Sequence, residues 1–211
     1  MKSGERQQSD ELPGEIPLFP LGGVLLLPRG QLPLNIFEPR YIAMVDDVLR
    51  EPSRLIGMVQ TRDDGSLYTV GCAGRITSYN ETADGRYEIV LTGLCRFRID
   101  DELAQRNGYR RGAAAWDEFT HDMDRLDCLG MDRDRLKTLL KNYFEKQGLT
   151  CSWEAVDLAA DDRLMTTLAM VCPFDSKEKQ ALLEAPCGKE RAKLFMTLLE
   201  MECRGDCGCK H

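Results

Sequence analysis

The stretch that most constrains the fold runs from Leu32 to Tyr41 and reads Leu-Pro-Leu-Asn-Ile-Phe-Glu-Pro-Arg-Tyr. Its first half is an apolar strand that passes without a loop into an amphipathic helix. One helical face then carries the apolar residues Tyr41, Met44, Val45, Val48 and Leu49. Pro39 suits the first helical turn, because its φ is already helical and its missing N–H would have had no partner there. The stretch therefore predicts a strand followed by a single helix that Pro52 stops soon after Arg50.

Residues 16 to about 118 carry short apolar runs separated by turn signals. Asp-Gly pairs at 64–65 and 84–85 indicate tight hairpins, because both residue types accept positive φ. Apolar and polar residues alternate from Tyr87 to Thr92, which is the period of a half-buried strand. We expect six or so short antiparallel strands, with a break at Gly71 to Gly74. Closure into a small barrel would remove the exposed edges of such a sheet.

A charged linker, Asp117 to Arg135, is expected to separate these strands from a helical second half. Three helical faces are predicted from apolar spacing: Leu136, Leu139, Leu140, Tyr143 and Phe144; Leu164, Met165, Leu168 and Val171; Phe195, Leu198 and Leu199. Helix-ending residues follow these segments: Gly148, Pro173 and Pro186. Asp175 and Glu178 have the spacing of a capping box at the start of another helix. Together with a short piece from Trp153 to Leu158, the pattern predicts a bundle of four or five helices.

Charge and hydropathy exclude several classes of protein. With 28 Lys plus Arg against 35 Asp plus Glu, the net charge is −7, so long-range attraction to nucleic-acid phosphate is not expected. No stretch approaches the roughly 20 consecutive apolar residues of a membrane span. Residues 1–14 are polar and lack the apolar core of an export signal, so we expect a disordered lead and a cytoplasmic protein.

Four segments together resemble the Lon N-terminal (substrate-binding) domain family. Ile16 to Val45 contains the Leu-Pro-Leu-(His/Asn)-Ile-Phe-Glu-Pro-Arg-Tyr pattern of the family, and Val70 to Ile76 and Leu91 to Ile99 are similar to its barrel strands. Pro173 to Glu184 looks like its helical half. The resemblance implies an α+β fold, in which a PUA-like small β-barrel with one inserted helix is followed by a C-terminal helical bundle.

On this basis we expect four regions and a stand-alone member of the family. The regions are a disordered lead at 1–14, the PUA-like β-barrel at 15–118, the helical bundle at 119–202 and a Cys-rich tail at 203–211.

The resemblance implies a recognition module that binds polypeptide segments or partner proteins. The sequence has no Gly-x-x-x-x-Gly-Lys-(Ser/Thr) loop for a nucleotide and no serine–lysine pair in a protease context. Its two histidines, His121 and His211, lie in the predicted linker and at the last position, where a general base would lack fixed geometry. We therefore predict that the chain is not an enzyme. Proline-broken runs between Pro17 and Pro33 are expected near sheet edges, which could accept an extended peptide.

Two other functions stay open. PUA-like barrels often bind RNA, although the net charge and the lack of a dense basic and aromatic stretch count against nucleic acid. The Cys-rich tail would instead make the chain a metal- or redox-responsive regulator. The oligomeric state is not predicted.

The charged residues of the opening stretch have structural explanations. The motif residues are Pro33, Phe37, Glu38, Arg40 and Tyr41. Glu38 would favour the positive N-terminus of the helix, and Arg40 would pair with a carboxylate across the barrel. Asn35 stands where many members of the family have His, so a role for an imidazole there does not transfer.

Nine cysteines occur, and two of them, Cys95 and Cys172, fall among buried apolar residues. Four potential Zn²⁺ ligands cluster at the end: Cys203, Cys207, Cys209 and His211. Their Cys-x₃-Cys-x-Cys-x-His spacing is not a standard zinc pattern, and a flexible reduced tail is the alternative. Apart from this possible zinc ion, no cofactor is expected.

Overall fold

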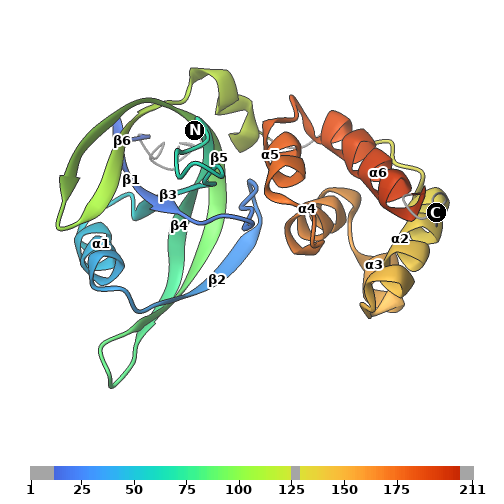
Figure 1. Ribbon diagram of the computed structural model, residues 1–211, viewed down its shortest axis with the longest axis horizontal. Coiled ribbons are helices and arrows are strands. Elements are labelled where there is room, and N and C mark those ends of the chain that lie inside the picture. The colour runs from blue at the N-terminus through green and yellow to red at the C-terminus, as the bar shows by residue number, and fades with distance from the viewer. Residues whose placement is uncertain (1–11, 125–128, 205–211) are drawn as a thin grey trace, which may run out of the picture.

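The structure is a computed structural model that describes residues 12–124 and 129–204. Figure 1 shows two parts side by side, a strand-rich part formed by the first half of the chain and a helical part formed by the second. The predicted α+β architecture, a barrel with one inserted helix followed by a helical bundle, is confirmed. No helix in the described ranges is long and apolar enough to cross a membrane.

Six strands form one sheet in the order β2-β5-β4-β3-β1-β6, and a further pairing of β5 with β6 closes five of them into a ring, with β2 paired to β5 outside it. The strands are β1 (Glu15–Pro20), β2 (Gln31–Ile36), β3 (Leu55–Val59), β4 (Val70–Glu81), β5 (Tyr87–Arg106) and β6 (Tyr109–Ala115). Closure depends on the 20-residue strand β5, which pairs with β4 from Tyr87 to Arg98 and with β6 from Arg98 to Arg106. The ring encloses the apolar side chains of the barrel core.

Two expectations about the strands are wrong. β1 and β3 run parallel, with Leu18 opposite Gly57, whereas only antiparallel neighbours were expected. The predicted break at Gly71 to Gly74 lies inside β4. A side chain at Gly71 would place its Cβ 2.7 Å from the carbonyl oxygen of Met58, so glycine is required there by close packing of backbones and not by a turn.

The helix α1 (Pro39–Arg50) follows β2 as predicted, with Pro39 in its first turn. It covers one side of the barrel (Figure 1) and buries the predicted apolar face. Two tyrosines of the sheet bind its acidic residues. The Tyr87 hydroxyl donates to Asp46 Oδ1 at 2.8 Å, and the Tyr109 hydroxyl donates to Asp47 Oδ2 at 2.9 Å. These bonds join α1 to β5 and β6.

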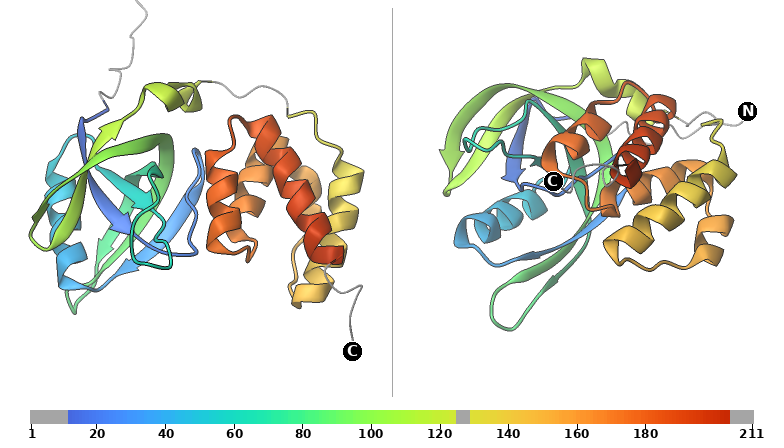
Figure 2. Two further views of the ribbon diagram at one scale, coloured as in Figure 1. Left: turned by 45° about the horizontal axis from the view of Figure 1, so that its top comes forward. Right: turned by 45° about the vertical axis from the view of Figure 1, so that its right-hand side comes forward.

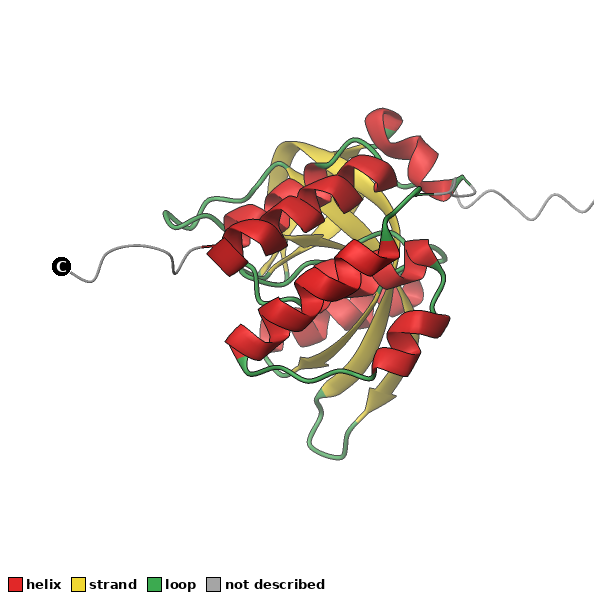
Figure 3. Ribbon diagram, turned by 90° about the vertical axis from the view of Figure 1, so that its right-hand side faces the viewer, coloured by secondary structure: helices red, strands yellow, loops and turns green. Residues whose placement is uncertain are grey.

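The second half forms five α-helices after a short 3-10 helix. The elements are η1 (Asp117–Met123), α2 (Arg133–Gln147), α3 (Trp153–Leu158), α4 (Asp161–Val171), α5 (Ser176–Glu184) and α6 (Gly188–Arg204). In Figure 2 α5 lies between the barrel and the other helices, and Figure 3 shows the helices in front of the sheet. The predicted capping box at Asp175 and Glu178 is present, and Gly148 ends α2 in the left-handed conformation, as predicted.

The charged linker expected from Asp117 to Arg135 is only partly correct, because η1 occupies its first seven residues and packs against β5. Phe119 and Asp122 are buried on this short helix. The expected boundary between residues 118 and 119 falls inside η1, and α2 already begins at Arg133. Charge composition alone did not reveal that this segment is folded against the barrel.

We expect Gly71→Ala to lower the free energy of unfolding by about 1–3 kcal/mol, because the added methyl group must push apart β3 and β4. Gly14→Ala is the matched control, since no atom lies within 4 Å of its added Cβ, and it should change stability by less than about 0.5 kcal/mol. Urea unfolding measures both, and equal stability of the two variants would contradict the packing argument.

Candidate functional site

An open apolar groove of about 790 Å³ lies between the C-terminal end of α2, the short helix α3 and the helix α4. Its larger apolar lining residues are Phe144, Leu149, Val156, Leu158, Leu164, Leu168 and Val171. Among the described lining residues, Arg163 is the single charged side chain, and hydroxyl groups come from Thr150, Ser152 and Thr167. Such a surface suits apolar side chains of a ligand, with a few hydroxyl groups to bind polar atoms.

Three large apolar side chains at this groove are exposed to solvent. Leu158 is 80% exposed, Val171 is 63% exposed, and Leu149 is also exposed. Val171 was predicted to face the helical core, and this prediction is wrong. Single exposed apolar residues are ordinary, but a contiguous set around a groove is typical of a binding surface.

The turn between α2 and α3 gives the groove its shape. Gly148 adopts a φ of 65° and ends α2, and the Leu149 N–H donates to the Phe144 carbonyl at 2.8 Å. Ser152 then caps α3 by accepting from the Ala155 N–H at 3.2 Å. The chain therefore reverses within a few residues and leaves Leu149 at the edge of the groove.

Arg133 holds the other end of α3. Its guanidinium donates to the Asp157 carbonyl at 3.0 Å and to the Ala159 carbonyl, and its Nε donates to Asp161 Oδ1 at 2.6 Å. One side chain of α2 thus binds the C-terminal carbonyls of α3 and the first residue of α4. The three helices that form the groove are fixed relative to one another.

The two thiols in the groove add to its apolar character. Burial raises the pKa of Cys172 to about 12 and also raises the pKa of Cys151. Both thiols are therefore protonated at neutral pH and act as small apolar groups.

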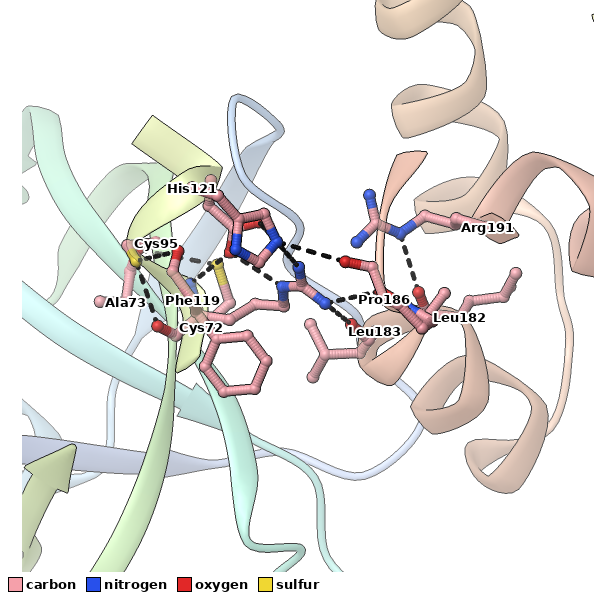
Figure 4. Close-up of polar contacts among 12 residues, drawn as sticks. Cys72, Ala73, Cys95, Phe119, His121, Leu182, Leu183, Pro186 and Arg191 are labelled. Carbon is pink, nitrogen blue, oxygen red and sulfur yellow. Dashed lines mark hydrogen bonds and ion pairs between the residues drawn. The ribbon is translucent and has the colours of Figure 1, made fainter. Parts of the chain in front are cut away.

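A buried ion pair joins β5 of the barrel to η1 and to the end of α5, and Figure 4 shows this region with His121, Phe119 and Leu183 labelled. Arg96 of β5 is 1% exposed, and its Nε and Nη2 each donate to one oxygen of Asp122 at 2.8 Å. Its Nη1 donates to the carbonyls of Leu183 at 3.0 Å and Ala185 at 2.7 Å, at the end of α5. One guanidinium therefore connects β5, η1 and α5.

The pKa of Asp122 reflects this pairing. Burial alone would raise the pKa, but hydrogen bonds from the Arg96 side chain and backbone N–H hold it below its ordinary value. Asp122 is consequently ionised at neutral pH in spite of its burial. His121 lies beside the pair, with Nε2 at 3.2 Å from both Arg96 Nη2 and the Pro186 carbonyl oxygen.

Two further residues of α5 bind the barrel. Gln180 donates to the Val70 carbonyl at 3.0 Å and accepts from Gln60 at 3.1 Å, and Lys179 donates to the Gly23 carbonyl at 2.8 Å. The barrel face of α5 is polar and buried, whereas the groove is apolar and open.

Sequence reasoning missed the Arg96–Asp122 pair, because Asp122 stood in a charged run and Arg96 alternated with buried residues of a strand.

The residues of the opening motif form no cluster with the groove. Glu38 is the N-cap residue of α1 but makes no capping hydrogen bond with its side chain. Its Oε2 accepts from Arg40 Nε at 2.9 Å and Nη2 at 2.7 Å, so the predicted pairing of Arg40 across the barrel is wrong. The Arg40 guanidinium lies 4.7 Å from the ring centre of Tyr41. Phe37 is 64% exposed, and Pro33 lies on β2, the strand at one end of the sheet order.

The predicted zinc ligands are only partly within the described residues. Cys203 lies on α6, with its thiol 4.0 Å from the Leu139 carbonyl oxygen. Cys207, Cys209 and His211 lie outside the described residues, so a zinc site there stays a prediction. Within 12–124 and 129–204, no group of three or more His, Cys, Asp or Glu residues could hold a metal ion.

A mixed sheet closed by the β5–β6 pairing, with helices after it, defines a two-part α+β fold, and comparison with known families identifies it. The ATP-dependent protease La (LON) substrate-binding domain matches residues 15–201, so the chain belongs to this family.

The curated relatives are much longer than this chain. Lon protease 2 of Myxococcus xanthus is 28% identical over 199 residues, which are 90% of this chain and 24% of the relative. The Lon protease of Anaeromyxobacter dehalogenans is 27% identical over 199 residues, 90% of this chain and 23% of that protein. The chain thus spans about a quarter of the length of these relatives.

Solved structures agree with the fold. The Lon N-terminal domain protein from Xanthomonas campestris is 26% identical, with a TM-score of 0.65 over 87% of this chain and 97% of that chain. The N-terminal domain of the Mycobacterium avium complex Lon protease is 17% identical, with a TM-score of 0.64 over 92% of this chain and 100% of that chain. At that identity the second structure shows the fold alone.

We expect Arg96→Met to lower the free energy of unfolding by about 3–5 kcal/mol, because it leaves the Asp122 carboxylate buried and unpaired. The matched control is Arg98→Met on the same strand, whose partner Glu118 is exposed. That change should cost less than about 1 kcal/mol in urea unfolding. Equal losses from the two variants would show that the buried pair does not hold the two parts together.

The contribution of Asp122 should depend on pH. Its pKa is lower in the folded than in the unfolded chain, so its stabilisation is complete above the unfolded value of about 3.9. The stabilisation is lost as the pH falls through the folded value. The stability difference between the wild type and Asp122→Asn should therefore be constant near neutral pH and shrink below about pH 4. Urea unfolding from pH 7 down to pH 3 checks this, and a constant difference would contradict it.

Proposed function

We propose that this chain is a non-enzymatic recognition module that binds apolar segments of polypeptides in the groove between α2, α3 and α4. The observation that carries the proposal is the exposure of Leu149, Leu158 and Val171 around a groove with one charged lining residue. The family description as a substrate-binding domain supports a polypeptide ligand.

The groove favours weak binding with little dependence on sequence. Burying one large apolar side chain contributes about 1.5–3 kcal/mol, and association costs several kcal/mol. Three contacts near the upper value contribute about 9 kcal/mol and leave about 5 kcal/mol after an association cost of about 4 kcal/mol, an affinity on the order of 100 μM. Hydroxyl groups of Thr150 and Ser152 at the groove can bind the backbone of an extended segment.

The chemistry of the groove supports binding without catalysis. Acid–base catalysis needs titratable groups in fixed positions, and the described lining contains no Asp, Glu or His. The two cysteines carry protonated thiols because burial raises their pKa values, so they are poor nucleophiles at neutral pH.

The terminal strand β2 is a weaker candidate for peptide binding. In the described sheet it pairs with β5 alone, so its other edge could accept an extended segment. Pro33 stands in the middle of this six-residue strand and has no N–H to donate. The proline-broken run that begins at Pro17 was expected near a sheet edge. Its strand β1 is not at an edge, because it lies between β3 and β6.

RNA binding and metal or redox control by the tail stay predictions from the sequence.

Val171→Asp should weaken binding of an unfolded apolar polypeptide at least tenfold, because it puts a charge beside the groove. Phe37→Asp is the matched control, since Phe37 is 64% exposed, close to the 63% of Val171, and lies beside β2. Both changes are at the surface and should leave stability within about 0.5 kcal/mol. Fluorescence anisotropy with labelled peptides and with labelled single-stranded RNA measures the effect.

The outcomes separate the candidates. Loss of peptide binding with Val171→Asp alone supports the groove, and loss with Phe37→Asp alone would assign binding to the β2 edge. Absence of peptide binding at about 100 μM wild-type protein would overturn the proposal, and binding of RNA alone would favour the nucleic-acid alternative.

A further inference from the structure

A second hollow of about 370 Å³ lies between the barrel and the helical half, apart from the apolar groove. Its charged and titratable lining includes Arg29 and His121 from the first half of the chain and Asp162, Lys189 and Arg191 from the helices. The helix α4 supplies Met165 and Thr166 to this cleft, whereas Leu164 and Thr167 line the groove. The two hollows therefore lie on different sides of α4, and the cleft has more charged lining residues than the groove.

Arg191 is the unusual member of this cleft. It is 8% exposed, and its Nε donates to the Leu182 carbonyl at 2.8 Å. Its buried Nη2 has no hydrogen-bond partner among the described residues. In the projection of Figure 4 the terminal nitrogens of Arg191 lie on the side of its chain that faces His121 and Pro186. A buried donor without a partner is costly, so this nitrogen points to a missing acceptor.

Charge balance indicates what that acceptor should be. Two buried guanidiniums, Arg96 and Arg191, stand near one buried carboxylate, Asp122, which leaves an excess of one positive charge. Both oxygens of Asp122 already accept from Arg96. Burial and the positive charge of Arg96 together lower the pKa of Arg191 to about 10, yet the group stays protonated at neutral pH. A buried positive charge in excess is stabilised by an added anion.

The start of α6 provides further attraction for an anion. The 17-residue helix begins at Gly188, and Gly188 and the exposed Lys189 both line the cleft. The N-terminal turn of a helix presents free N–H groups and a partial positive charge. Asp122, Asp124 and Asp162 also line the cleft and oppose an anion, so the ligand must be small and its binding weak.

We propose that this cleft binds a small oxyanion, a phosphate or carboxylate group, between Arg191, Lys189 and the first turn of α6. The acceptor oxygens of the ion satisfy Arg191 and neutralise the excess charge. Because both halves of the chain line the cleft, a bound ion stabilises their contact. This site is independent of polypeptide binding in the groove.

Thermal unfolding and isothermal titration of the full chain with inorganic phosphate test the site, with sodium chloride at equal ionic strength as the reference. We expect phosphate to raise the unfolding temperature and to bind with a Kd of about 0.1–10 mM. Acetate forms the second arm. A response to phosphate alone assigns the site to phosphate groups, and an equal response to acetate assigns it to oxyanions in general, including carboxylates.

Substitutions at the cleft should change affinity in opposite directions. Lys189→Gln should weaken phosphate binding about three- to tenfold, whereas Lys193→Gln, an exposed lysine of α6 outside the cleft lining, should not. Asp162→Asn should strengthen binding about two- to fivefold, because it removes a repelling charge. Arg191→Gln should abolish binding. If that variant does not fold, the comparison of Lys189→Gln with Lys193→Gln and the effect of Asp162→Asn test the site instead.

Three outcomes would overturn the proposal: no specific response to 10 mM phosphate, equal effects of the Lys189 and Lys193 substitutions, or weaker phosphate binding by Asp162→Asn.

Discussion

The arrangement of the two halves depends on one buried guanidinium. Arg96 projects from the barrel strand β5, binds both oxygens of Asp122 on η1 and donates to two carbonyls at the end of α5. A buried ion pair contributes little net stability compared with apolar packing, but removing one partner is severe, because it leaves a charge without water. Together with Gln180 and Lys179, the pair connects α5 to the barrel. Asp122 of this pair also lines the oxyanion cleft, whereas the groove lies on α2, α3 and α4.

Local chemistry made much of the fold predictable. Pro39 and the apolar spacing after it indicated α1, Asp175 and Glu178 indicated the start of α5, and Gly148 indicated the end of α2. Each of these signals acts within one turn of chain, so sequence alone contains it. Gly71 was misinterpreted because its role depends on the approach of Met58 from another strand. The same limit applies to Arg96 and Asp122, which are 26 positions apart and meet only in the folded chain.

The segment that identifies the family and the surface proposed to bind ligand are different parts of the molecule. Glu38 and Arg40 form an exposed local pair at the start of α1, while the groove is built from helices about a hundred residues later. The signals for the groove were weak in sequence. Val171 had the spacing of a core residue, and only its place at the end of α4 exposes it. Apolar spacing predicts which side of a helix can be buried, but it does not show whether another element covers it.

Closure of the barrel pairs Glu15 in β1 with Ala113 in β6, so contacts across almost a hundred positions complete the ring. The long strand β5 pairs with β2, β4 and β6, and no portion of residues 15–115 forms a closed sheet by itself. Folding of a sheet with such distant pairings is slow, because the chain pays the entropy of large loops before the contacts form. During synthesis the ring closes only after β6 has left the ribosome. Until then β1 lacks its partner β6, so its apolar strand edge is unpaired.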